Sequence, residues 1–393
     1  MNLKKDFFKY QAQTNNSPLG IIIKKAKGSF ITDSKNNKLL DFVAGVSVAN
    51  LGHSNPVIIK AIKSQLDKYS HVMVYGESIQ EPTVKLTKKI SQNLNNTLNV
   101  TFLTNSGTEA IEGALKMCKR YTGRDELIAA KYSYHGSTQG SLSVTGYEKQ
   151  TNKYGPLLPK IKFINFNKFS DLSKITRKTA GVILETIQGG AGFILPKINY
   201  LKMVKKRCNE VGALLVLDEI QPGLGRTGKM FSFQHYDISP DILVIGKALG
   251  GGLPIGAFCS SKKIMKCLSV NPKLGHISTF GGNPVIASAA YATINELLKS
   301  NLMNTIELKE KLFRKYLVHN KIKKINGRGL MLALIFKSNK IANKLVLESL
   351  KKNLILFWLL WEKKAVRITP PLTISKKEIK KGCDIIISIL NSM

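Results

Sequence analysis

The sequence predicts an α/β protein, with a large domain built on a mostly parallel central sheet and a smaller α+β domain built from both ends of the chain. Three observations support this fold class. The chain has 393 residues, which is more than a single hydrophobic core usually accommodates. Helical patterns alternate with short apolar runs from about residue 57 to 270. The two flanking regions show other patterns: residues 20–43 alternate apolar and polar side chains, and residues 295–393 mix helical segments with strand-like runs.

The central region predicts the large domain. Short apolar runs bounded by polar residues are typical of strands buried on both faces, and such strands separated by helices form parallel sheets. Helical periodicity is clearest at residues 56–69 and 109–120. The expected strands are VTFLTN (100–105), AGVILET (180–186), ALLVLDE (213–219) and DILVIGK (241–247).

The flanking regions predict the smaller domain. Residues 20–43 alternate apolar and polar side chains around an Asn-Asn turn, which indicates an antiparallel hairpin. Near the C-terminus, strand-like runs at 329–336 and 366–372 lie among helical segments. The expected domain limits are 1–50 for the N-terminal segment of the small domain, 51–290 for the large domain and 291–393 for the C-terminal small domain.

The formal net charge of +35 raises the question of nucleic-acid binding. Only eight of the 60 basic residues are arginine, and the lysines are spread along the whole chain. Sites for a phosphate backbone concentrate charge and favour the planar fork of arginine. We therefore expect no specific binding to nucleic acid. The lysine excess is typical of mutational drift at surface positions in an A+T-rich genome. Weak, non-specific polyanion binding is the alternative.

Targeting and metal-binding signals are missing from the sequence. The N-terminal residues lack an apolar core of signal-peptide length and no run approaches a membrane span, so we expect a cytoplasmic protein without a membrane partner. The five cysteines are scattered without CxxC spacing or clustered histidines, so we expect free thiols and no metal site. The apolar, aromatic segment 353–364 is expected to be core or pocket wall.

Polar residues follow the ends of several predicted strands, where open α/β sheets bind their ligands. Ser106, Gly107 and Thr108 follow the first strand and open a helix. Free N–H groups at a helix N-terminus bind phosphate, although Ser-Gly-Thr is also an ordinary helix cap. Asp218 and Lys247 each end a buried strand, and such residues are rarely buried without a partner.

An acid and a lysine at the ends of two core strands are what pyridoxal-phosphate chemistry needs. The lysine holds the cofactor as a Schiff base, and the acid keeps the pyridine nitrogen protonated so that the ring can accept electrons. Burial also lowers the pKa of a lysine, which helps it to act as a nucleophile and then as a general base. Asp218 and Lys247 therefore predict pyridoxal 5'-phosphate (PLP) as the cofactor.

Five segments resemble the class III, fold type I aminotransferases, a PLP-dependent family that includes acetylornithine, ornithine and 4-aminobutyrate aminotransferases. The resemblance covers nearly the whole chain and is most specific around Asp218 and Lys247. It implies the fold of a fold type I PLP-transferase. The segments are LDFVAGVSVANLGHSNP (40–56), NSGTEA (105–110), YHG (134–136), DEIQPGLGRTGKMFSFQHYDISPDILVIGKALGGGLPIGA (218–257) and STFGGNP (278–284).

The resemblance implies roles for individual residues. Lys247 would be the Schiff-base lysine, and Asp218 would be the partner of the pyridine nitrogen. Tyr134 would stack on the ring, and Gln221 would lie near its phenolic oxygen. The cradle for the phosphate would consist of Ser106, Gly107 and Thr108.

The resemblance also implies a homodimer with shared active sites and a substrate-binding arginine. Thr279 would reach the phosphate of the cofactor in the neighbouring subunit. Arg367 occupies the position of an arginine that binds a substrate carboxylate. The planar guanidinium of an arginine suits this task better than the ammonium of a lysine, because it can make two parallel hydrogen bonds to a carboxylate. A surface salt bridge is the alternative role for Arg367.

Two positions depart from the acetylornithine and ornithine enzymes. Ser137 stands where an arginine usually helps to bind a substrate carboxylate. Gly190 stands where those enzymes have a glutamate, which gates the C-terminal arginine between the two half-reactions. Without that gate, Arg367 would be permanently available for a carboxylate.

These features predict a class III transaminase of the acetylornithine type. We expect it to move an amino group from an ω-amino donor, N-acetylornithine first, to 2-oxoglutarate in arginine or lysine biosynthesis. Alternative donors are N-succinyl-diaminopimelate, ornithine or another ω-amino acid. Two other possibilities stay open: a PLP racemase or aminomutase on the same fold, and a basic nucleic-acid-binding protein that has lost its enzymatic role.

Overall fold

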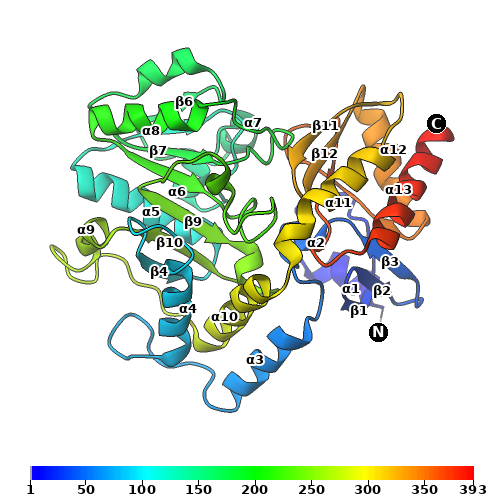
Figure 1. The fold of residues 1–393 in the computed structure, drawn as a ribbon, viewed down its shortest axis with the longest axis horizontal. Helices are drawn as coiled ribbons and strands as arrows, with labels where there is room; N and C mark the ends of the chain where they lie inside the picture. The colour runs from blue at the N-terminus through cyan, green and yellow to red at the C-terminus, as the bar shows by residue number, and fades with distance from the viewer. Residues whose placement is uncertain (1) are drawn as a thin grey trace.

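A seven-stranded sheet forms the centre of the larger part of the computed structural model, which describes residues 2–393 (Figure 1). In spatial order its strands are β4 (Val100–Thr104), β10 (Gly256–Ser260), β9 (Ile242–Gly246), β8 (Leu214–Asp218), β7 (Thr179–Glu185), β5 (Glu126–Ala130) and β6 (Ile161–Ile164). The five strands from β9 to β6 run parallel. The prediction of a mostly parallel sheet is confirmed, although β10 is antiparallel to both of its neighbours.

Helices cover both faces of this sheet (Figure 1). On one face, α5 (Gly107–Thr122) shares a hydrophobic core with Val216 of β8, and on the other, α8 (Tyr200–Val211) shares a core with Leu217. Successive side chains of a strand point to opposite faces, so each strand must be apolar at every position. This is why the strands read as continuous apolar runs in the sequence.

Three helices pack together beside β4 in the larger part. They are α3 (Pro56–Leu66), α4 (Glu81–Ser91) and α10 (Pro284–Lys299). Because α10 packs along both other helices, it crosses the expected domain limit at residue 290 without a break. We therefore propose that the large domain extends to the end of α10.

Both ends of the chain contribute to the smaller part of the molecule (Figure 1). The short strand β13 (Leu354–Ile355), from near the C-terminus, pairs in parallel with β3 (Lys38–Asp41) from near the N-terminus. The predicted hairpin around the Asn-Asn turn is confirmed, and β1 (Ile23–Lys27) extends it beyond β2 (Phe30–Asp33). The second sheet of this part consists of β11 (Ile322–Arg328), β12 (Met331–Phe336), β15 (Ala365–Ile368) and β14 (Phe357–Trp358).

The remaining helices are distributed over both parts. The smaller part contains α11 (Leu302–Tyr316), α12 (Asn339–Lys351) and α13 (Lys376–Asn391). Short helices and turns are α1 (Leu3–Tyr10), α2 (Ala44–Ser47), α6 (Gln139–Ser143), α7 (Glu148–Thr151), α9 (Lys262–Met265), η1 (Phe169–Lys174), η2 (Ser232–His235), η3 (Lys247–Gly250) and η4 (Lys266–Leu268). Within residues 2–393, none of these helices combines the length and the apolarity needed to cross a bilayer.

A buried arginine joins the two parts. The guanidinium of Arg226 donates hydrogen bonds to the carbonyl oxygens of Leu330 and Pro370 and to the side chain of Asn50. Asn50 in turn donates to the carbonyl oxygen of Leu224 at 2.8 Å. Burial lowers the pKa of Arg226 to about 9. A buried cation is tolerated only with such partners, so this cluster fixes the loop after β8 against the smaller part.

The contact between Gly382 of α13 and Phe42 tests how tightly the two chain ends pack. A Cβ atom on Gly382 would lie 2.1 Å from Cζ of Phe42. Gly382→Ala should therefore lower the free energy of unfolding by about 1–3 kcal/mol, because overpacking outweighs the gain in helix propensity. Denaturant-induced unfolding measures this change.

Lys381→Ala is the matched control for this prediction, because Lys381 is exposed in the same helix. It should change the free energy of unfolding by less than about 0.5 kcal/mol. Equal stabilities for the two variants would show that α13 does not pack closely on Phe42.

Candidate active site

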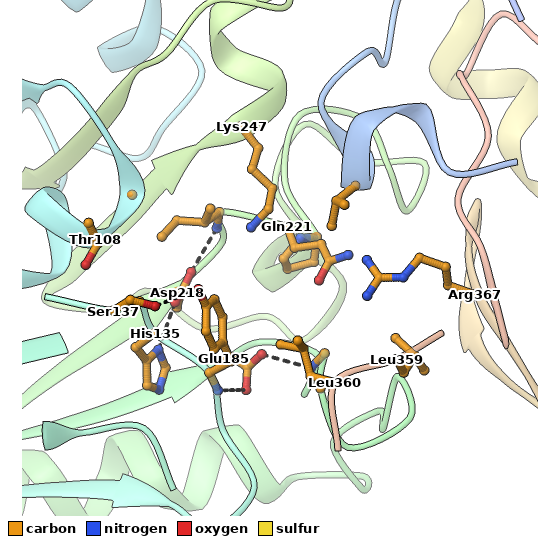
Figure 2. Close-up of a pocket in the computed structure, with 18 of the residues that line it drawn as sticks. Thr108, His135, Ser137, Glu185, Asp218, Gln221, Lys247, Leu359, Leu360 and Arg367 are labelled. Atoms are coloured by element: carbon orange, nitrogen blue, oxygen red, sulfur yellow. Dashed lines mark hydrogen bonds and ion pairs between the residues drawn. The ribbon is translucent and has the colours of Figure 1, made fainter. Parts of the chain in front are cut away.

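A cavity of about 440 Å³ lies between the carboxyl ends of β7, β8 and β9 and the smaller part of the molecule. This volume is in the usual range for small-molecule sites. Figure 2 shows Lys247, Asp218, Gln221 and Arg367 arranged around it. The predicted site residues that line the cavity are Gly107, Thr108, Tyr134, Asp218, Gln221, Lys247 and Arg367.

Lys247 enters the cavity from the turn that follows β9 (Figure 2). Asp218 is paired with Val244 in the register of β8 and β9, so Lys247 comes just beyond the level of the acid. The φ angle of Lys247 is 45°, which turns the chain away from the strand direction at this residue. Burial lowers the pKa of the Lys247 amine, while the nearby carboxylate of Asp218 opposes this shift. More of the amine is therefore unprotonated and nucleophilic at neutral pH.

Asp218 is held in place by two hydrogen bonds. Its side chain is almost completely buried, and one oxygen accepts from the backbone N–H of Ile220 at 3.0 Å. The other oxygen lies 2.8 Å from Nδ1 of His135. Among residues 2–393, Nε2 of His135 has no hydrogen-bond partner although it is buried. The Nδ1–H group therefore donates to Asp218, and the imidazole fixes the orientation of the carboxylate.

Glu185 is a second buried acid at this edge of the sheet, and sequence reasoning missed it. It ends β7 directly beside Asp218 in the strand register. Its carboxylate accepts from the N–H groups of Gly189 at 2.8 Å and Tyr134 at 3.3 Å. Burial raises its pKa to about 7; His135 opposes this shift, whereas the charge of Asp218 adds to it. The signal that could have revealed it is its position, because it ends a strand next to the predicted acid.

Two of the three residues predicted to cradle the phosphate line the cavity. Gly107 and Thr108 line the cavity at the N-terminus of α5, where the first N–H groups of a helix have no partner inside the helix. The hydroxyl of Ser106 instead caps α5 by accepting from the N–H of Glu109 at 3.3 Å. Gly136 has a φ of 136°, and a Cβ atom there would lie 2.3 Å from the Thr108 hydroxyl oxygen. This glycine keeps the space beside Thr108 open.

The remaining predicted residues differ in their placement. Tyr134 lines the cavity wall, and its hydroxyl lies 3.4 Å from the Ser137 hydroxyl. Gln221 also lines it and donates from its side-chain amide to the hydroxyl of Ser47 at 3.3 Å. Thr279 is exposed and lies outside this cavity. Its predicted role concerns a neighbouring subunit, so it stays a prediction.

Arg367 lies on β15 and points into the cavity from the side of the smaller part (Figure 2). It is only 5% exposed, and its Nε donates to the carbonyl oxygen of Trp358 at 2.9 Å. Its Nη1 is buried without a hydrogen-bond partner among residues 2–393. Burial lowers the pKa of the guanidinium to about 10. The segment 353–364 is confirmed as pocket wall, since it contributes Phe357, Leu359 and Leu360 to the lining.

The residues of the cavity fit PLP. An amine and a carboxylate at the ends of neighbouring strands face the same space, and the N-terminus of α5, which begins at Gly107, lies beside them. A Cβ atom on Gly107 would lie 2.7 Å from Cδ1 of Ile220, so only glycine lets α5 begin this close to the loop after β8. Arg367 adds a buried donor without a partner, as a site for an anionic substrate requires.

Comparison with known proteins agrees with the site. The model of the family "Aminotransferase class-III" matches residues 10–390. An acetylornithine aminotransferase of Caldanaerobacter subterraneus is 36% identical over 95% of each chain, and a putrescine aminotransferase of Pectobacterium atrosepticum is 36% identical over 98% of this chain and 87% of its own. The structure of the ornithine aminotransferase from Toxoplasma gondii superposes with a TM-score of 0.91 at 28% identity, covering 100% of this chain and 96% of that one. The chain therefore belongs to the class-III aminotransferases, which are PLP-dependent enzymes of fold type I.

Proposed function

We propose that this enzyme transfers the amino group of an ω-amino donor that carries a carboxylate, N-acetylornithine first, to 2-oxoglutarate. The observation that carries the proposal is Arg367, a buried guanidinium that lines the cavity with an unpartnered Nη1. The similarity to an acetylornithine aminotransferase supports this donor and a place in arginine or lysine biosynthesis. N-succinyl-diaminopimelate, ornithine and other ω-amino acids carry a carboxylate too and are the alternative donors.

The chain's own residues would perform the proton transfers. PLP, when bound, supplies an electron-poor ring that takes up the charge left when the donor's carbon loses its proton. Lys247 would hold the aldehyde carbon of the cofactor until the donor's amine displaces it, and its freed Nζ would then take the proton from the donor's amine-bearing carbon. The lowered pKa of Lys247 favours both tasks, because each needs an unprotonated amine.

Asp218 would keep a negative charge opposite the ring nitrogen. His135 and the N–H of Ile220 hold the two carboxylate oxygens, so the charge has a fixed position. The N–H groups of Gly107 and Thr108 would bind the phosphate. Ser106 would support this cradle indirectly, because its hydroxyl caps the first turn of α5.

Other parts of the proposal concern the ring and the partner subunit. Tyr134 would stack on the ring, and Gln221, which the Ser47 hydroxyl orients, would contact its phenolic oxygen. Thr279 is exposed, as a residue serving a neighbouring subunit of a homodimer must be. We also propose that the enzyme is cytoplasmic.

A donor screen with the PLP-loaded enzyme tests the proposed reaction. We expect N-acetylornithine and 2-oxoglutarate to give glutamate with a kcat/KM at least tenfold above that for putrescine, which has no carboxylate for Arg367 to bind. A coupled glutamate assay measures both rates. A racemase or aminomutase would form no glutamate from any donor, and a faster reaction with putrescine would contradict the proposed donor class.

Arg367→Lys tests the carboxylate anchor. Lysine keeps the positive charge but cannot make two parallel hydrogen bonds to a carboxylate. Losing one charge-assisted hydrogen bond costs about 1.5–3 kcal/mol, so kcat/KM for 2-oxoglutarate should fall by about 10–150-fold. Steady-state kinetics with varied 2-oxoglutarate measures this. Arg328→Lys, outside the cavity, is the matched control, and an unchanged kcat/KM for Arg367→Lys would contradict the assigned role.

A further inference from the structure

Four consecutive residues beside the cavity have a left-handed backbone. The φ angles of Ala44, Gly45, Val46 and Ser47 are 52°, 59°, 64° and 64°. The N–H of Ser47 donates to the carbonyl oxygen of Val43 at 3.0 Å, which closes the turn. Of the four residues only Gly45 adopts such angles without a steric cost, and a β-branched residue such as Val46 rarely adopts them. The surrounding structure must therefore hold this turn in place.

The carboxylate of Asp41 holds the beginning of the turn. One of its oxygens accepts hydrogen bonds from the N–H groups of Val43 at 2.7 Å and Ala44 at 3.0 Å. The other oxygen lies 2.8 Å from Nε2 of His53, which fixes the orientation of the carboxylate. Asp41 is only 1% exposed, and hydrogen bonds to an ionised acceptor are stronger than those between neutral groups. These bonds offset part of the cost of the left-handed angles.

The turn supplies part of the cavity wall. Val46 lines the cavity, and the hydroxyl of Ser47 accepts a hydrogen bond at 3.3 Å from the side-chain amide of Gln221, which also lines it. On the other side, the hydroxyl of Thr369, directly after β15, donates to the carbonyl oxygen of Val43 at 3.0 Å. A change in the turn would therefore move groups that face the cavity from both parts of the molecule.

We propose that Asp41 is a positioning residue of the active site: its hydrogen bonds hold residues 44–47 in the left-handed turn that keeps Ser47 against Gln221 and Val46 in the cavity wall. Asp41 itself is buried outside the cavity, so it acts through the turn. Without its carboxylate the turn relaxes toward negative φ angles, and the Ser47 hydroxyl leaves Gln221. The effect on PLP binding rests on the proposed function, because it assumes that Gln221 contacts the cofactor.

Substitutions at positions 41 and 44 separate this role from a general loss of stability. Asp41→Ala removes the acceptor, whereas Asp41→Asn keeps an oxygen that can accept from both N–H groups. Adding Ala44→Gly to Asp41→Ala should restore the turn, because glycine adopts a φ of 52° without a steric cost. Ala49→Gly is the matched control, since it removes the same methyl group from a buried residue whose φ angle is negative.

Hydrogen exchange in the PLP-loaded enzyme reports on the turn itself, through mass spectrometry of peptides that cover residues 42–49. Asp41→Ala should speed exchange in these peptides by about tenfold and leave α5 unchanged, because the turn opens locally. Asp41→Asn should stay within about threefold of the wild type, and so should Asp41→Ala combined with Ala44→Gly. Asp41→Ala combined with Ala49→Gly should exchange as fast as Asp41→Ala alone.

The dissociation constant of PLP, measured by equilibrium dialysis of the loaded enzyme, reports on the site. Ser47→Ala removes one hydrogen bond to Gln221 and should raise this constant by about 2–10-fold. Asp41→Ala should raise it at least as much, and Ala44→Gly should reverse the increase. Gln221→Leu identifies a failure of the proposed function: an unchanged PLP affinity would show that Gln221 does not contact the cofactor, while the exchange data would still decide the role of Asp41.

Unchanged exchange at residues 42–49 in Asp41→Ala would overturn the inference. So would fast exchange that Ala44→Gly does not slow, because the cost of the left-handed angles would then not be what Asp41 offsets. Should Asp41→Ala not fold in either background, the single variants decide. Ala44→Gly should then have a higher Tm than Ala49→Gly, and an equal or lower Tm would overturn the inference.

Discussion

A carboxylate and an amine at the ends of neighbouring buried strands are the constraint on which the rest of this structure depends. Removing ionisable groups from water is costly unless partners compensate for the loss. For Asp218 the partners are His135 and a backbone N–H group, which also fix its orientation. For Lys247 the cost is reduced because burial lowers its pKa, which favours the neutral, reactive amine. The same burial that makes these residues unfavourable in a core would make them useful for the PLP chemistry that we propose.

The two parts of the molecule supply different components of the site. The parallel strands of the larger part set the position of Asp218 and, through the turn after β9, of Lys247. The smaller part contributes Arg367 on β15, whose residues are buried and paired on both sides. The Arg226 cluster ties the loop after β8 to the smaller part. Under the proposed function, chemistry and substrate recognition would therefore come from separate elements that this cluster holds together.

Much of the fold and of the candidate site could be predicted from the sequence, because the decisive signals are local. A strand buried on both faces is apolar throughout, so a charged residue at its end stands out in the sequence. This signal predicted Asp218 and Lys247 as site residues. The contribution of Ser106 was harder to foresee, since the same sequence can cap a helix or bind phosphate. The antiparallel pairing of β10 and the hydrogen bond of His135 to Asp218 each join residues that are far apart in the chain. No spacing rule reveals such contacts.

Covalent capture of the cofactor tests the central claim most directly. The PLP-loaded enzyme would be reduced with borohydride, digested and mapped by mass spectrometry. The account predicts one phosphopyridoxyl group per chain, on Lys247, although the chain contains 52 lysines. A label on another lysine, or one spread over the lysine-rich surface, would contradict it.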